Sequence, residues 1–292
     1  MSALPSPPFR LCDSSYSLRT EIVYPPHLWV NEMSENMIIR RNFEEQLSEL
    51  QEDLMRLGRF VQEAHGKAID SLMRGDLQLA KQIINDDDFA DDMTFGIQAR
   101  ATQLLALQQP MARDLRFVAS VLKIVTDLER IGDHASDVAK VTRTMAGQSY
   151  LRPPVDLNQL SKLACEMIGN SLQAFVQHDT VLAIQVARDD DAVDDLCDEV
   201  QRDMMNLMRA DSSRVEQATR LLLVARSLER SADHATNIAE QVYYVETGQM
   251  RPLAREEHNH ALLTSLGVNE AEIKRINGSQ EGDRVDDKPE QV

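Results

Sequence analysis

Long stretches of helical periodicity with little proline dominate the middle of the chain. Between Phe43 and Gly248 the only prolines are Pro110 and the pair Pro153 and Pro154. A proline inside a helix costs about 3 kcal/mol, so such stretches permit long helices. Runs of β-branched residues that alternate with period two are missing, and aromatic residues make up only 4%. These patterns predict an all-α fold.

Prolines and two turn signals divide this region into six expected helices. Pro110 lies between two apolar-periodic segments. The dipeptides Gly75-Asp76 and His178-Asp179 indicate turns in which an aspartate caps the following helix. The expected helices cover residues 40–74, 76–109, 111–147, 156–178, 179–209 and 213–247.

A block of polar and apolar residues occurs twice, 100 positions apart. Its recurring members are Leu128, Glu129, Arg130, Asp133 and His134 in the first copy, and Leu228, Glu229, Arg230, Asp233 and His234 in the second. Charged positions recur together with apolar ones, so a shared helical rhythm does not explain the match. Aspartates earlier in each half also recur, at an offset of 103. The chain is therefore an internal duplication, and it predicts two tandem three-helix bundles.

The duplication also sets the expected domains. We expect a mobile extension over residues 1–36, which hold five prolines and show no helical period. The first bundle should cover residues 37–150 and the second residues 151–250. Residues 251–292 should form an acidic, mostly disordered tail after one short helix.

Composition narrows the class of protein. A net charge of −17 disfavours nucleic acid as a partner, because binding to phosphates needs clustered Lys and Arg. Three widely spaced cysteines fit no zinc motif and indicate reduced thiols in a cytosolic protein. No stretch reaches the roughly 18 apolar residues of a membrane span, so we expect no direct membrane insertion. A secretory signal is not evident either.

Acidic pairs continue the core-facing stripe of two expected helices. At 100° per residue, Glu129 and Asp133 project within about 20° of Leu115 and Leu122. Asp87 and Asp91 share a face of the preceding helix in the same way. The equivalent residues in the second half are Glu229, Asp233, Asp190 and Asp194.

Converging carboxylates of this kind predict an oxygen-rich site for Fe, Mn, Zn or Mg. Like charges at i,i+4 need neutralisation, and Arg130 and Arg230 each project about 100° away from the neighbouring glutamate. The competing interpretation is a solvated edge of the bundle. His134 and His234 also project about 100° away from the acids, which favours a structural hydrogen-bonding role over metal ligation.

Enzyme motifs are missing. The chain has no GxxxxGK[ST], GxGxxG, HExxH or GxSxG sequence, and its only ExxH, at residues 257–260, lies in the expected tail. We therefore expect a protein that is not an enzyme. Two alternatives stay open: a carboxylate-bridged metalloenzyme, and a histidine phosphotransfer module that uses His134 or His234.

Two segments resemble the signature of the PhoU family: PMARDLR at residues 110–116 and LERIGDH at residues 128–134. The resemblance covers residues 38–248. It implies two similar three-helix bundles that form a homodimer in the cytoplasm, as an accessory protein of the phosphate-specific transport system. It also implies repression of the phosphate-starvation response, through contacts with the transporter ATPase and the phosphate-sensing histidine kinase.

Some members of this family carry multinuclear iron or zinc clusters on acidic helix faces. The resemblance implies that the ligands here would be Glu129, Asp133, Asp137, Glu229 and Asp233. Two departures stand out: Asn237 replaces the equivalent of Asp137, and residues 210–214 lack the proline-containing turn of the first half. We therefore expect tighter metal binding in the first half.

Overall fold

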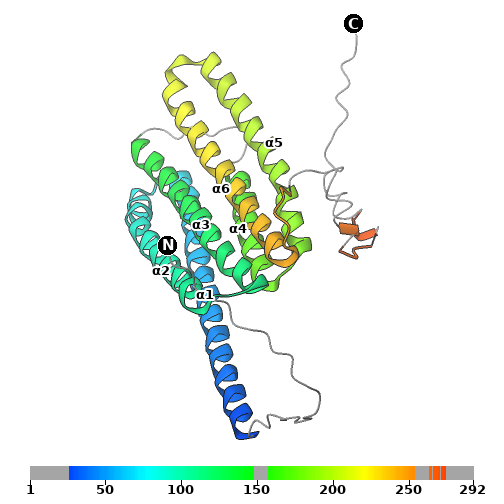
Figure 1. The fold of residues 1–292 in the computed structure, drawn as a ribbon. Helices are drawn as coiled ribbons and strands as arrows, with labels where there is room; N and C mark the ends of the chain where they lie inside the picture. Colours follow the sequence, from blue (N-terminus) through cyan, green and yellow to red (C-terminus); the bar gives the residue numbers. More distant parts are fainter. Residues whose placement is uncertain (1–25, 148–156, 254–262, 265, 270, 274–292) are drawn as a thin grey trace, which may run out of the picture. The chain divides into compact units, whose positions relative to one another are not determined.

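The computed structural model describes residues 26–147, 157–253, 263–264, 266–269 and 271–273, with side chains from residue 40 onward. Six long helices and one 3-10 turn make up the described core (Figure 1). They are α1 (Pro26–Arg74), α2 (Leu77–Gln108), α3 (Ala112–Thr144), α4 (Leu157–Gln177), α5 (Thr180–Ala210), η1 (Ser212–Arg214) and α6 (Val215–Thr247). Most helix ends therefore lie within three residues of the ends expected from the sequence.

The start of α1 is the main exception. The helix begins at Pro26, inside the segment 1–36 that we expected to be a mobile extension. Proline suits the first helical position because its missing N–H would have no partner there in any helix. No further proline interrupts residues 27–74. The expected boundary near residue 40 was therefore wrong, and residues 1–25 lie outside the described part.

Aspartate caps start the second helix of each half, as expected. Asp76 accepts hydrogen bonds from the backbone N–H groups of Gln78 and Leu79 through Oδ1, both at 3.0 Å. Asp179 does the same for Val181 and Leu182, at 2.9 and 3.0 Å. These contacts satisfy N–H groups that have no carbonyl partner inside a helix.

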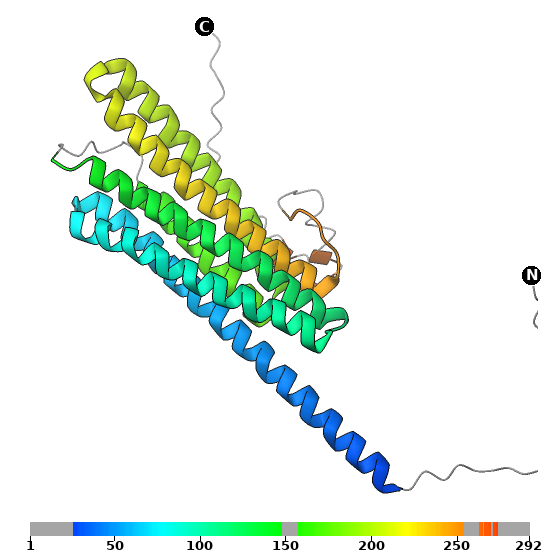
Figure 2. The same cartoon turned by 60° about the vertical axis from the view of Figure 1, so that its left-hand side comes forward.

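Helices α3 and α6 pack against each other along their length and run in opposite directions (Figure 2). The paired residues establish the direction: the Ser120 hydroxyl contacts Gln241, and Asp127 contacts His234 seven residues further along α3. Phe117 of α3 also stacks on Phe175 of α4, with ring centroids 5.2 Å apart. The third helices of the two halves thus form the centre of the molecule.

Helices α1 and α4 form a second contact between the halves. A Cβ atom at Gly58 would lie 2.4 Å from Leu172 Cδ1, and one at Gly169 would lie 2.6 Å from Gln62 Nε2. Glycine inside a helix costs about 0.5–1 kcal/mol, and here it leaves room for the side chain of the facing helix. Gln62 then donates a 2.8 Å hydrogen bond to the carbonyl of Cys165.

Within each half the helices form a bundle, which confirms the expected fold class. Helix α2 packs on α3, and α4, α5 and α6 pack on one another. Asp53 of α1 pairs with Arg100 of α2 at 2.6 Å, and Ser71 of α1 contacts Thr142 of α3 at 3.2 Å. Among the described residues no strand is present, and no described helix is long and apolar enough to cross a membrane.

The segment after α6 departs in part from the expected tail. Leu253, Leu263 and Ile273 are buried, although we expected most of residues 251–292 to be disordered. Their apolar side chains gain free energy by leaving water. The ExxH sequence at residues 257–260 lies outside the described residues.

Removal of one aspartate cap should destabilise the fold by about 1 kcal/mol. We expect Asp76→Ala to lower the free energy of unfolding by that amount in urea denaturation. Asp76→Asn is the matched control, because asparagine caps a helix about as well as aspartate. Equal losses in the two variants would contradict the capping role.

Candidate functional site

The first acidic face consists of Asp87 and Asp91 on α2 and Glu129 and Asp133 on α3. The members of each pair are four residues apart, so they lie on one side of their helix. Helix α2 packs on α3, and the charges of Asp91 and Asp133 act on both Asp87 and Glu129. The structure therefore brings together the four acids that the sequence assigned to this face.

Partial burial makes this face costly when it is fully ionised. Burial raises the pKa of Asp87 above its ordinary value; the Ser136 hydroxyl opposes the shift, and the charges of Asp133 and Asp91 add to it. Burial likewise raises the pKa of Glu129, against the nearby charge of Arg130. The face therefore has too little positive charge to balance its carboxylates.

Arg130 lies closer to these acids than we expected. Its guanidinium reaches both neighbours, with Nε 3.7 Å from Glu129 Oε2 and Nη1 3.4 Å from Asp133 Oδ2. The prediction from projection angles was wrong because the long arginine side chain curls back over its own helix. Both contacts are long and solvent-exposed, so they neutralise the pair only in part.

The second acidic face repeats the arrangement on α5 and α6 with Asp190, Asp194, Glu229 and Asp233. Burial raises the pKa of Asp190 to about 7, and the charges of Asp233, Asp194 and Asp191 add to the shift. The Oδ1 atom of Asp190 is buried without a hydrogen-bond partner. At neutral pH this carboxyl therefore holds a proton for part of the time.

The two faces differ in their neutralising contacts. In the second half Arg226, one turn before Glu229, forms the ion pair with that glutamate. The thiol of Cys197 donates a 3.0 Å hydrogen bond to Glu229 Oε2. Burial, together with the contact to Glu229, raises the pKa of Cys197 to about 12, so the thiol stays protonated. The equivalent position of the first half is Thr94.

A pair of buried hydroxyls beside the acids was missed by the sequence reasoning. Ser136 and Thr236 lie three residues after Asp133 and Asp233, and each hydroxyl lowers the pKa of the aspartate that faces it from the preceding helix. Neither hydroxyl forms a hydrogen bond of good geometry. The recurrence of a hydroxyl at the same place in the duplicated block was the available signal.

Asp137 is not joined to the first face by any contact that the structure records. It pairs with Lys140 at 2.9 Å, while the equivalent Asn237 donates a 3.3 Å hydrogen bond to Asp127 across the α3–α6 junction. Position 137 projects about 80° away from position 129 on a helix, which explains the separation. The expectation of tighter metal binding in the first half stays a prediction.

The two duplicated histidines meet at the centre of the molecule. Their rings stack with centroids 5.7 Å apart, and His234 Nδ1 lies 2.9 Å from Asp127 Oδ1. His134 is 4% exposed, and burial followed by the charge of Arg230 lowers its pKa to about 4. His234 thus has the hydrogen-bonding role that the sequence favoured, whereas His134 contributes its stacked ring and has a buried Nε2 atom without a hydrogen-bond partner.

The donors at both faces suit a hard cation, since carboxylate oxygens prefer such ions and Asp190 Oδ1 is an unpartnered acceptor. However, no three His, Cys, Asp or Glu side chains among the described residues are arranged to hold a metal ion. Loading with iron or zinc would require these side chains to move. The geometry thus provides the donors but no preformed cage.

An internally duplicated six-helix fold that carries one acidic face in each half defines a narrow class of proteins. The chain matches the PhoU domain twice, over residues 54–142 and 157–242. It belongs to the PhoU family.

Curated relatives match over most of their length. One from Clostridium acetobutylicum, named a phosphate-specific transport system accessory protein PhoU homolog, is 36% identical over 211 residues, which are 72% of this chain and 96% of the relative. A relative of the same name from Aquifex aeolicus is 37% identical over 205 residues, which are 70% and 93% of the two chains.

Solved structures of PhoU proteins have the same fold as this chain. The crystal structure of PhoU from Pseudomonas aeruginosa superposes on this chain with a TM-score of 0.69 at 33% sequence identity. The match covers 71% of this chain and 100% of the Pseudomonas aeruginosa chain. The phosphate transport system regulatory protein PhoU from Streptococcus pneumoniae gives a TM-score of 0.67 at 32% identity, covering 72% and 99%.

Asp190→Asn should stabilise the metal-free protein at alkaline pH. The folded-state pKa of Asp190, about 7, lies above the ordinary value of 3.8, so the folded state binds the extra proton. The stability that the protonated Asp190 contributes to the folded state is therefore lost as pH rises from about 4 to 7. After a discount for solvent screening, we expect a gain of about 1–2 kcal/mol at pH 8, and little gain at pH 4, in urea denaturation with chelator.

The control for this measurement is Asp191→Asn. Asp191 is the exposed neighbour on α5, and its substitution should change stability by less than about 0.5 kcal/mol at either pH. A gain for Asp190→Asn that is equally large at both pH values would contradict the raised pKa.

Proposed function

We propose that this protein is a cytoplasmic, non-enzymatic accessory protein of phosphate transport that represses the phosphate-starvation response. The observation that supports this most strongly is the match to the Clostridium acetobutylicum accessory protein, which extends over 96% of that relative. The names of this relative and of the Streptococcus pneumoniae structure describe an accessory protein and a regulatory protein.

The proposed mechanism is that of an adaptor. The chain would contact the ATPase subunit of the phosphate transporter and the phosphate-sensing histidine kinase, as a homodimer. Its net charge of −17 favours basic partner surfaces, because complementary charge speeds diffusional encounter. The acidic faces on α2–α3 and α5–α6, where carboxylates from two helices converge, are the first surfaces to test.

Burial argues against the alternative of histidine phosphotransfer. A phosphotransfer histidine must be reached by a kinase, but His134 is 4% exposed. His234 has a side-chain exposure of 19% and contacts Asp127, whose negative charge would repel a phosphoryl group. The carboxylate-bridged metalloenzyme stays as the second candidate, supported by the converging oxygens of each face.

Deletion of the gene should leave phosphate-starvation genes expressed at high phosphate. A reporter strain complemented with the full chain should regain repression. A chain that starts at Met37 should also restore repression, because residues 1–36 lie outside the two matched domains. Full repression in the deletion strain at high phosphate would contradict the regulatory function and favour the metalloenzyme.

We also propose that the two acidic faces take up iron or zinc. Asp133→Asn and Asp233→Asn should each reduce the metal content of anaerobically purified protein and the stoichiometry in calorimetric titration, because each variant removes one anionic oxygen donor. Asp88→Asn is the matched control, since Asp88 is exposed on α2 beside the first face. Undiminished binding in both test variants would reject the faces as metal ligands.

A further inference from the structure

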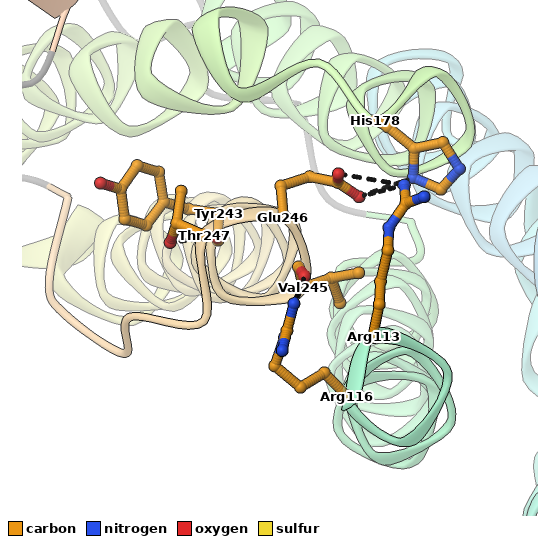
Figure 3. A network of polar contacts seen from close by, with 7 residues as sticks. All are labelled: Arg113, Arg116, His178, Tyr243, Val245, Glu246 and Thr247. Carbon is orange, nitrogen blue, oxygen red and sulfur yellow. Dashed lines mark hydrogen bonds and ion pairs between the residues drawn. The ribbon is translucent and has the colours of Figure 1, made fainter. Parts of the chain in front are cut away.

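One cluster of charged side chains connects three helix ends that belong to different halves (Figure 3). Arg113, in the first turn of α3, donates from Nη2 to both oxygens of Glu246 at the end of α6, at 2.8 and 3.0 Å. His178, in the turn between α4 and α5, places Nδ1 2.9 Å from Glu246 Oε1. We call Arg113, His178 and Glu246 the Glu246 cluster.

His178 adopts a strained backbone conformation to take part in this cluster. Its φ is 56°, in the left-handed region that costs a non-glycine residue about 1–2 kcal/mol. The equivalent turn of the first half uses Gly75, with φ 64°, where glycine has no such cost. A histidine is thus present where glycine would form the same turn more easily, and its contact with Glu246 gives the side chain a reason to be there.

All three members of the cluster depart from the internal duplication. Gly75 stands at the position equivalent to His178, Ser213 at that equivalent to Arg113, and Ala146 at that equivalent to Glu246. The three equivalent positions therefore lack every group needed to build a second copy of this cluster. The cluster is therefore present at this end of the molecule and has no counterpart in the duplication.

Arg116 strengthens the same junction without using a carboxylate. Its Nε and Nη2 atoms donate to the carbonyl of Val245 at 3.0 and 2.9 Å (Figure 3). This carbonyl lies in the last turn of α6, where no further helical N–H is available and the helix dipole favours a cation. Arg116 thus keeps α3 against α6 at any pH, because a guanidinium does not lose its proton in proteins.

The contact of His178 with Glu246 depends on the charge state of the histidine, whereas the contacts of Arg113 and Arg116 do not. The charged groups at this junction are Glu246 on α6, Arg113, Asp114 and Arg116 near the start of α3, and Asp179 in the same turn as His178. Asp179 is engaged in capping α5. Among these residue types, imidazole is the one whose ordinary pKa lies within the physiological range.

We propose that the Glu246 cluster is a proton-dependent clamp that fastens the start of α5 to the α3–α6 junction. With the imidazole protonated, Glu246 binds two cations, one from each side, and the α4–α5 turn is held by an ion pair. With the imidazole neutral, the Glu246 carboxylate retains Arg113. The turn then keeps at most one hydrogen bond from an uncharged imidazole N–H. The same helix α5 carries Asp190 and Asp194 of the second acidic face.

Hydrogen exchange of the full chain tests this clamp. After correction for intrinsic rates, amides of residues 178–184 should exchange about two- to fivefold more slowly near pH 6 than near pH 8.5, the range of an exposed ion pair. Glu246→Gln and His178→Gln should both remove this pH dependence. His178→Gly should remove it as well, while exchange at alkaline pH stays as slow as in the wild type, because glycine relieves the backbone strain.

The matched control is Glu216→Gln, the same substitution near the other end of α6, where Glu216 pairs with Arg220. It should leave the pH dependence of residues 178–184 unchanged. Persistence of that dependence in Glu246→Gln, or its absence in the wild type, would overturn the proposal. Circular dichroism of each variant separates these results from a general loss of fold.

Discussion

The antiparallel contact between α3 and α6 is the interaction on which the rest of the structure depends. Each helix buries a continuous apolar stripe at this contact, with Val121, Leu128 and Ala135 on α3 fully buried. The opposite edges then carry Glu129 with Asp133 and Glu229 with Asp233. Because α2 packs beside α3 and α5 beside α6, each acidic edge meets the aspartates of a second helix. The position of both acidic faces follows from one packing contact.

The fold could be predicted because several local signals agree with each other. Proline spacing, the aspartate caps at Asp76 and Asp179, and the recurrence of polar residues all indicate three helices in each half. The early start of α1 at Pro26 was missed, because a segment rich in proline and serine is typical of a mobile extension. Its last proline is in fact the first residue of the helix, a position that proline favours. The buried Leu263 and Ile273 were missed because isolated apolar residues in a polar segment give no period.

At the acidic faces, helical geometry predicted which carboxylates converge. Tertiary contacts determine which cations and hydrogen-bond donors reach those carboxylates. The 100° rule places Asp87 with Asp91 on one side of a helix, whatever the neighbours are. It cannot foresee that Arg130 curls back to Asp133, or that the thiol of Cys197 reaches Glu229 from another helix. Asp137 was assigned to the first face by the family resemblance and not by this rule, which turns position 137 about 80° away from Glu129.

Duplication gave the two faces the same carboxylates, and later differences gave them different electrostatics. In the first face Arg130 contacts both Glu129 and Asp133 at long range. In the second face Arg226 engages Glu229, and the carboxyl of Asp190, with an unpartnered oxygen, takes up a proton near neutral pH instead. A cation or basic surface that approaches the second face must therefore displace a proton, and one that approaches the first face meets more fully ionised acids. Two sites of common origin can in this way respond to different conditions within one six-helix fold.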